Sequence, residues 1–185
     1  MVAGRHGEAP LRGDANTMTT DINTHTISVL VDNESGVLAR VIGLFSGRGY
    51  NIESLTVAEV DPAEKLSRIT LVTSGTPMVI EQIKAQLGRL VPVRRVHDLT
   101  VEGPHVSREL ALVKVVGTGE KRVEALRIAD IFRANVVDSS NESFVFEIVG
   151  KTDKLNAFIN LMEPLGLVDV ARTGAAAIAR GSESI

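Results

Sequence analysis

The segment over residues 33–38, Asn-Glu-Ser-Gly-Val-Leu, has the residue types of a small-anion site. Alternating apolar residues over 27–31 precede it, which indicates a strand, and apolar residues at helical spacing follow it. Ser35 is the candidate N-cap of this helix. The first helical N–H groups lack partners inside the helix and favour a carboxylate above the turn. These groups belong to Gly36, Val37 and Leu38. An ordinary capped helix would have the same residues, so this segment alone leaves both interpretations open.

A second residue, Asn51, favours the binding site over the plain helix cap. It opens the extended run that follows the first predicted helix, and in a side-by-side pair of protomers it can lie across from the turn at 33–38. An asparagine offers a carbonyl acceptor for an ammonium group and an amide donor for a carboxylate, without titrating. Together with free helical N–H groups, this combination suits a zwitterionic amino acid.

Other chemistries have weak support in the sequence. The four histidines form no ligand pair at short spacing and there is no cysteine, so a metal site is not expected. Residues 117–121 lack the spacing of a phosphate-binding loop, and the glycines over 47–49 follow a helix instead of opening one. Acidic residues such as Glu34 and Glu59 are interpreted as solubilising charge, because nothing pairs them as acid and base.

Composition excludes several classes of protein. Hydrophobic residues make up 44% of the chain, yet no apolar run reaches the roughly 18 residues of a membrane span. A net charge of -3 gives no electrostatic footprint for nucleic acid or an anionic membrane. An aromatic content of 3% argues against RNA-binding domains of similar element order, which stack bases on Phe and Tyr. The absence of cysteine fits a reducing compartment, and we expect the protein to be cytoplasmic.

Periodicity predicts the order β-α-β-β-α-β twice along the chain. The first set comprises a strand ending near residue 31, a helix closed by the glycines over 47–49, strands over 51–60 and 67–74, a helix that the N-cap Thr76 and Pro77 begin, and a strand over 91–99. The second comprises a strand over 110–116, a helix over 120–132, strands over 135–139 and 143–149, a helix over 152–162 that Pro164 stops, and a strand over 167–172. We therefore expect an α+β fold of two ferredoxin-like βαββαβ domains.

These elements set the expected domain boundaries. A flexible tail covers 1–24, the first domain 25–99, a linker 100–108, and the second domain 109–173. The tail over 174–185 is expected to add a short helix around its alanines. Met18 lies shortly before the first strand and is an alternative start to Met1.

Several segments follow the pattern of a known protein family. The most specific is RGYNIESL over 48–55, which comes after the turn at 33–38. Further matching segments lie over 66–70, 82–87, 108–115, 131–133 and 171–174. On these residues the chain resembles the small, regulatory subunits of acetolactate synthase (acetohydroxyacid synthase), which are built on an N-terminal ACT domain.

The resemblance implies a non-catalytic subunit that stimulates the large catalytic subunit and confers feedback inhibition by valine, or another branched-chain amino acid, in isoleucine, leucine and valine biosynthesis. It implies no cofactor in this chain, with thiamine diphosphate, Mg and FAD in the catalytic partner. It also implies a homodimer with the effector at its interface. By position, the effector-binding residues would be Asn33, Gly36, Val37, Leu38, Asn51 and Ile52. The alternative is a free-standing, amino-acid-sensing ACT protein that regulates transcription or another enzyme.

Overall fold

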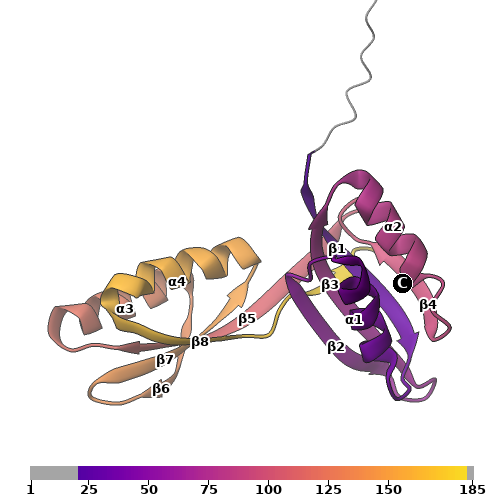
Figure 1. The fold of residues 1–185 in the computed structure, drawn as a ribbon. Coiled ribbons are helices and arrows are strands. Elements are labelled where there is room, and N and C mark those ends of the chain that lie inside the picture. Colours follow the sequence, from indigo (N-terminus) through magenta and orange to yellow (C-terminus); the bar gives the residue numbers. More distant parts are fainter. Residues whose placement is uncertain (1–20, 183–185) are drawn as a thin grey trace, which may run out of the picture.

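A long strand, β5 (His105–Val116), runs from the first of two α+β domains into the second in the computed structural model, which describes residues 21–182 (Figure 1). Each domain is an antiparallel sheet with two helices on one face. The predicted α+β fold of two βαββαβ units is confirmed. Residues 1–20 of the expected tail lie outside the described residues, and β1 already begins at Asn23.

The first domain positions the candidate site. It consists of β1 (Asn23–Asp32), α1 (Val37–Arg48), β2 (Ser54–Asp61), β3 (Leu66–Gly75), α2 (Pro77–Leu87) and β4 (Val93–Asp98). The strand order is β2-β3-β1-β4, so β2 and β4 are edge strands. Alternate apolar residues of β1 and β3 pack against apolar stripes of both helices, as the periodicities predict. The fully buried members include Ile27, Val29, Val31, Val41, Phe45, Ile69, Leu71, Ile80, Ile83 and Leu87.

A buried polar pair joins two neighbouring strands at one end of this sheet. His25 Nδ1 at the start of β1 lies 2.7 Å from Asp98 Oδ2 at the end of β4. Both residues are buried, so the carboxylate has its hydrogen-bond partner where water is largely excluded.

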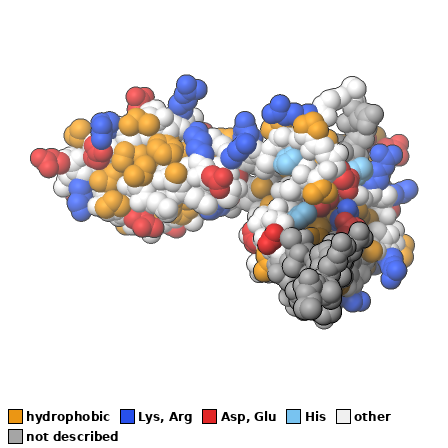
Figure 2. All heavy atoms as spheres, turned by 90° about the horizontal axis from the view of Figure 1, so that it is seen from above, with side chains coloured by type: hydrophobic (Ala, Val, Ile, Leu, Met, Phe, Trp, Pro, Cys, Tyr) orange, Lys and Arg blue, Asp and Glu red, His pale blue; other side chains and the backbone are white. Residues whose placement is uncertain are grey.

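The second domain repeats the architecture with its own core. Its elements after β5 are α3 (Gly119–Phe132), β6 (Asn135–Ser139), β7 (Ser143–Gly150), α4 (Thr152–Gly166) and β8 (Leu167–Arg172), and its strand order is β6-β7-β5-β8. Phe146 of β7 meets Phe158 of α4 edge to face, with ring centroids 6.0 Å apart. Figure 2 shows hydrophobic side chains on the outer face of the helices, where Val123, Leu126 and Leu161 are exposed.

Two predicted helix ends differ from the structure. Ser35 is not the N-cap of α1, since Gly36 holds that position with a left-handed φ of +83° and no side-chain cap. Glycine adopts this φ without the steric penalty of a Cβ. The helix therefore starts one residue later than the serine would have set it. Pro164 does not stop α4, which continues to Gly166. A proline in the last turn costs a single internal hydrogen bond, so the helix tolerates it. The predicted N-cap Thr76 of α2 is confirmed, accepting from the Val79 N–H at 3.4 Å.

The chain between the domains and after β8 is more regular than expected. His105–Arg108, assigned to the linker over 100–108, form the first part of β5 and pair with β9 (Ala176–Ala179). The alanines expected to form a short helix are therefore a strand, because backbone pairing with β5 outweighs the helix propensity of alanine. This two-stranded ribbon lies over the first sheet, where its Ala177 and Thr56 of β2 line a common cavity of about 320 Å³.

Candidate functional site

The turn between β1 and α1 presents open backbone donors. No atom lies within 4 Å of the place that a Cβ on Gly36 would occupy, so the space beside this residue is free. The Val37 N–H already donates to the Glu34 carbonyl at 3.3 Å. In residues 21–182, the N–H groups of Gly36, Leu38 and Ala39 have no hydrogen-bond partner. Two of the three predicted donors are thus available, and Ala39 stands in place of Val37.

Val37 contributes to the domain core more than to the turn. Its side chain is only 6% exposed and belongs to the core cluster of the first domain, whereas Leu38 is half-buried at the edge of the same cluster. The binding role expected of Val37 would have to come from its backbone N–H, which already donates to the Glu34 carbonyl.

Asn33 sets the polar character of the turn. Its backbone N–H donates to the Lys65 carbonyl at 2.7 Å, and its side-chain Nδ2 donates to Glu59 Oε1 of β2 at 3.0 Å. The amide nitrogen is engaged by Glu59, so the group that Asn33 can offer to a ligand is its amide oxygen, Oδ1, which is an acceptor. An ammonium group here would meet this oxygen and the nearby carboxylate of Glu59, while a carboxylate would meet the free N–H groups of α1.

Sequence reasoning missed Glu59, which it interpreted as solubilising charge. The strand registers explain its position, because Glu59 of β2 pairs with Ser67 of β3, and Ser67 pairs with Val31 near the end of β1. Periodicity shows which residues share a face of a strand. It does not give the register that brings Glu59 beside Asn33.

Asn51 and Ile52 lie at the opposite end of α1. The strand expected to open at Asn51 begins three residues later, at Ser54, so both residues are in the loop before β2. The Asn51 carbonyl accepts from Thr73 Oγ1 at 2.6 Å and its side chain is exposed, while Ile52 packs against the domain core. Since α1 has 12 residues, it separates this loop from Gly36 by about 18 Å. One chain therefore brings Asn33, Gly36 and Leu38 together, but not Asn51 or Ile52.

Metal binding and membrane crossing each require a recognisable arrangement of residues. Within 21–182, no group of three or more His, Cys, Asp or Glu side chains is arranged to hold a metal ion. In the same part of the chain, no helix has the length and apolar character needed to cross a membrane.

Comparison with known proteins covers both domains. The family model for the small subunit of acetolactate synthase matches residues 108–181, and the model for an AHAS small subunit-like ACT domain matches residues 27–95. The probable acetolactate synthase small subunit of Archaeoglobus fulgidus is 47% identical over 159 residues, which cover 86% of this chain and 98% of that protein. The acetolactate synthase isozyme 3 small subunit of Escherichia coli is 46% identical over 158 residues, covering 85% of this chain and 96% of the relative.

A solved structure agrees with these relatives. The acetolactate synthase small subunit of Thermotoga maritima superposes with a TM-score of 0.77 at 39% identity, covering 87% of this chain and 99% of that one. Both family models, close relatives of matching length and the shared two-domain fold lead to one conclusion. The chain belongs to the family of acetolactate synthase small subunits.

Proposed function

We propose that this chain is the regulatory subunit of an acetolactate synthase, which stimulates the large catalytic subunit and makes it sensitive to valine or another branched-chain amino acid. The turn at residues 33–38 carries the proposal, because its free N–H groups lie next to Asn33 and Glu59. This pairing complements the two charges of an amino acid. The chain itself would be non-catalytic, with thiamine diphosphate, Mg and FAD held by the large subunit, and the complex would act in the cytoplasm.

A second copy of the chain would complete the effector site. β2 is an edge strand, and its Val57 is 42% exposed. Antiparallel pairing of β2 with the same strand of a partner sets the start of one strand beside the end of the other. Asn51 and Ile52 precede the start of β2, whereas Glu59 and Asn33 lie at its end. A two-fold dimer would therefore bring Asn51 of the partner subunit toward Asn33, and would form two such sites.

The energies of this site limit what it can distinguish. A helix N-terminus contributes roughly 0.3–1 kcal/mol to an anion, and burial of an isopropyl group adds about 2–3 kcal/mol. Hydrogen bonds to both ends of the effector and closure of the dimer would supply the rest. One methylene separates valine from isoleucine and is worth about 1–3 kcal/mol, so we expect graded responses to the branched-chain amino acids.

Copurification with the large subunit tests the proposal. A tagged large subunit should retain this chain, and the isolated chain should form no acetolactate from pyruvate. Failure of the two proteins to associate would contradict the proposal. If the chain then bound valine by itself, that result would favour the free-standing sensor.

A further inference from the structure

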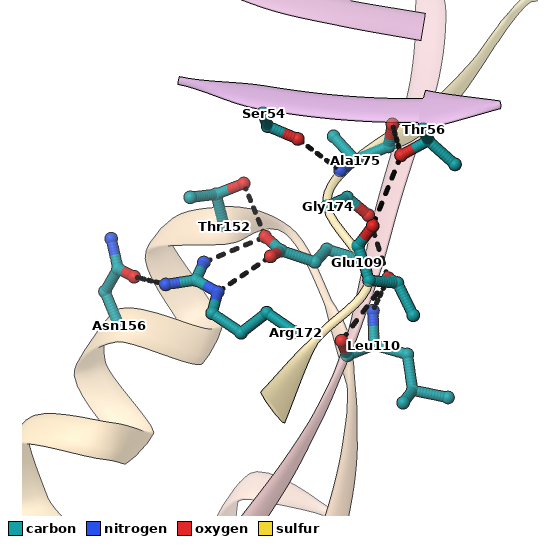
Figure 3. A network of polar contacts seen from close by, with 10 residues as sticks. Ser54, Thr56, Glu109, Leu110, Thr152, Asn156, Arg172, Gly174 and Ala175 are labelled. Carbon is teal, nitrogen blue, oxygen red and sulfur yellow. Dashed lines mark hydrogen bonds and ion pairs between the residues drawn. The ribbon is translucent and has the colours of Figure 1, made fainter. Parts of the chain in front are cut away.

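Ser54 and Thr56 of β2 hold a segment that belongs to the second domain. The N–H of Ala175 donates to Ser54 Oγ at 3.0 Å, and Thr56 Oγ1 donates to the Ala175 carbonyl at 3.0 Å (Figure 3). Two side chains thus bind both backbone groups of one residue, as a neighbouring strand would. Ala175 is buried by these contacts. We call residues 173–175, between β8 and β9, the strap.

Gly174 lets the strap come this close to β2. It has a φ of +80°, and a Cβ on it would lie 2.6 Å from Ser54 Oγ and 3.1 Å from Thr56 Oγ1. A side chain at this position would therefore meet both hydroxyl groups and would also strain the backbone. The contact between strap and β2 depends on a glycine here.

An ion pair anchors the other end of the strap. Arg172, the last residue of β8, binds Glu109 of β5 through two parallel contacts, Nε to Oε1 at 2.7 Å and Nη2 to Oε2 at 2.9 Å. The same two side chains reach α4, where Thr152 Oγ1 donates to Glu109 Oε2 at 3.1 Å and Arg172 Nη1 donates to Asn156 Oδ1 at 2.9 Å. Bidentate, charge-assisted contacts of this kind fix geometry as well as add energy. We call these four residues the clasp.

The strap and the clasp form one connection between the domains. Arg172 of the clasp directly precedes Thr173 of the strap, and Thr173 Oγ1 in turn accepts from the Leu110 N–H at 3.2 Å. On the other side, Ser54 follows Ile52, one of the proposed effector residues, by two positions. A cavity of about 470 Å³ is lined by Ser54, Glu109 and Asn156, so the clasp and the start of β2 face a common space.

We propose that the strap and the clasp couple the effector site in the first domain to the second domain, an inference that rests on the proposed regulatory function. Effector binding beside Asn51 and Ile52 would shift the start of β2. Because hydrogen bonds weaken steeply with distance and angle, the strap must follow Ser54 and Thr56 or lose its contacts. The clasp then passes the displacement to α4, a rigid element of the second domain.

The double variant Ser54→Ala with Thr56→Val separates coupling from binding. It removes both hydroxyl contacts to Ala175 and keeps side chains of similar size. In the reconstituted holoenzyme, we expect the valine concentration for half-inhibition to rise at least tenfold, within the 5- to 150-fold range of typical coupling factors. Valine affinity of the isolated subunit, measured by calorimetry, should stay within twofold of wild type, as should stimulation of the large subunit. Thr24→Val is the matched control, because it removes an exposed hydroxyl contact to Ser74 in the same domain.

Arg172→Lys tests the clasp independently. Lysine keeps the positive charge but cannot hold both Glu109 oxygens and Asn156 at once. We expect the same loss of valine inhibition with retained valine binding, while circular dichroism and the thermal midpoint report that the chain is folded.

Three outcomes would overturn the coupling proposal. Wild-type valine inhibition in a folded double variant would show that the strap is only structural. Parallel loss of valine binding would place these side chains in the effector site, and loss of stimulation without valine would place them in the contact with the large subunit. If wild-type subunit itself failed to bind valine or to confer inhibition, the proposed function would fail instead, and the two failures are thereby distinguished.

Discussion

Gly36→Asp should abolish valine binding while leaving the domain folded. The substitution meets no steric obstacle, because the position of its Cβ is open to at least 4 Å. Its left-handed φ of +83° costs a non-glycine residue about 1–2 kcal/mol, and aspartate is among the residues that tolerate it best. The domain should therefore fold, with a modest loss of stability.

Electrostatic repulsion sets the size of the effect. A carboxylate on residue 36 would lie near the free N–H groups of Leu38 and Ala39, where the effector carboxylate is proposed to bind. Two like charges about 4 Å apart repel by about 1 kcal/mol in water and about 4 kcal/mol near a protein surface. That range corresponds to roughly 5- to 1,000-fold in affinity. The aspartate would also occupy the donors itself, which adds to the loss.

Gly36→Asn is the matched control, since asparagine has the same shape and tolerates the same φ but carries no charge. Valine binding to both variants would be measured by calorimetry, and valine inhibition with reconstituted holoenzyme. We expect inhibition to vanish with Gly36→Asp, to be weakened only partly with Gly36→Asn, and stimulation of the large subunit to survive in both. Wild-type valine inhibition with the aspartate variant would refute the reasoning, because the turn would then be no more than a helix start. Equal loss of inhibition in both variants would show that charge repulsion is not the cause.

Further predictions concern acid stability, the second core and the dimer. Hydrogen bonding to Arg172 holds the pKa of Glu109 below its usual value. This carboxylate therefore stabilises the folded state fully above its unfolded pKa of about 4.3, and the stabilisation is lost as the pH falls through the folded pKa. In Glu109→Gln the unfolding free energy should vary less steeply with acid pH, and the slope should fall by up to about 1.4 kcal/mol per pH unit. Urea denaturation at pH 3–6 would measure this slope, and an unchanged slope would argue against the ion pair. Phe158→Ala should destabilise the second domain by about 3–5 kcal/mol, because the side chain is fully buried, whereas the exposed Val123→Ala should change stability by less than about 0.5 kcal/mol in the same denaturation assay. Comparable effects of both would contradict the assigned core. Val57→Asp should shift the chain toward monomer in sedimentation at micromolar concentration, because a residue near the middle of β2 would face its own copy across a two-fold axis, and Val57→Thr should not.

Sequence periodicity was sufficient for the architecture because it reports burial. Alternation over 27–31 and helical spacing from Val37 onward place the same residues in the core that the structure buries, such as Ile27, Val41 and Phe45. The hairpin between β2 and β3 at 62–65 was predictable as well, because turn-forming residues act through their own backbone preferences.

Features that depend on distant partners could not be predicted in this way. The alanines of β9 favour a helix locally, and only pairing with residues 105–108 makes them a strand. Glu59 acquires a place in the candidate site through two strand registers, and the left-handed φ of Gly36 depends on how β1 meets α1. The bonds that join β2 to the strap link residues about 120 positions apart, such as Ser54 and Ala175 at a separation of 121, and no local pattern reports them.

The most direct test of the regulatory role is the rate of acetolactate formation by the large subunit, measured against valine concentration with and without this chain. We predict that the chain raises the rate in the absence of valine, and that valine lowers it only when the chain is present. An unchanged rate on addition of the chain, or equal inhibition by valine of the large subunit alone, would contradict the account.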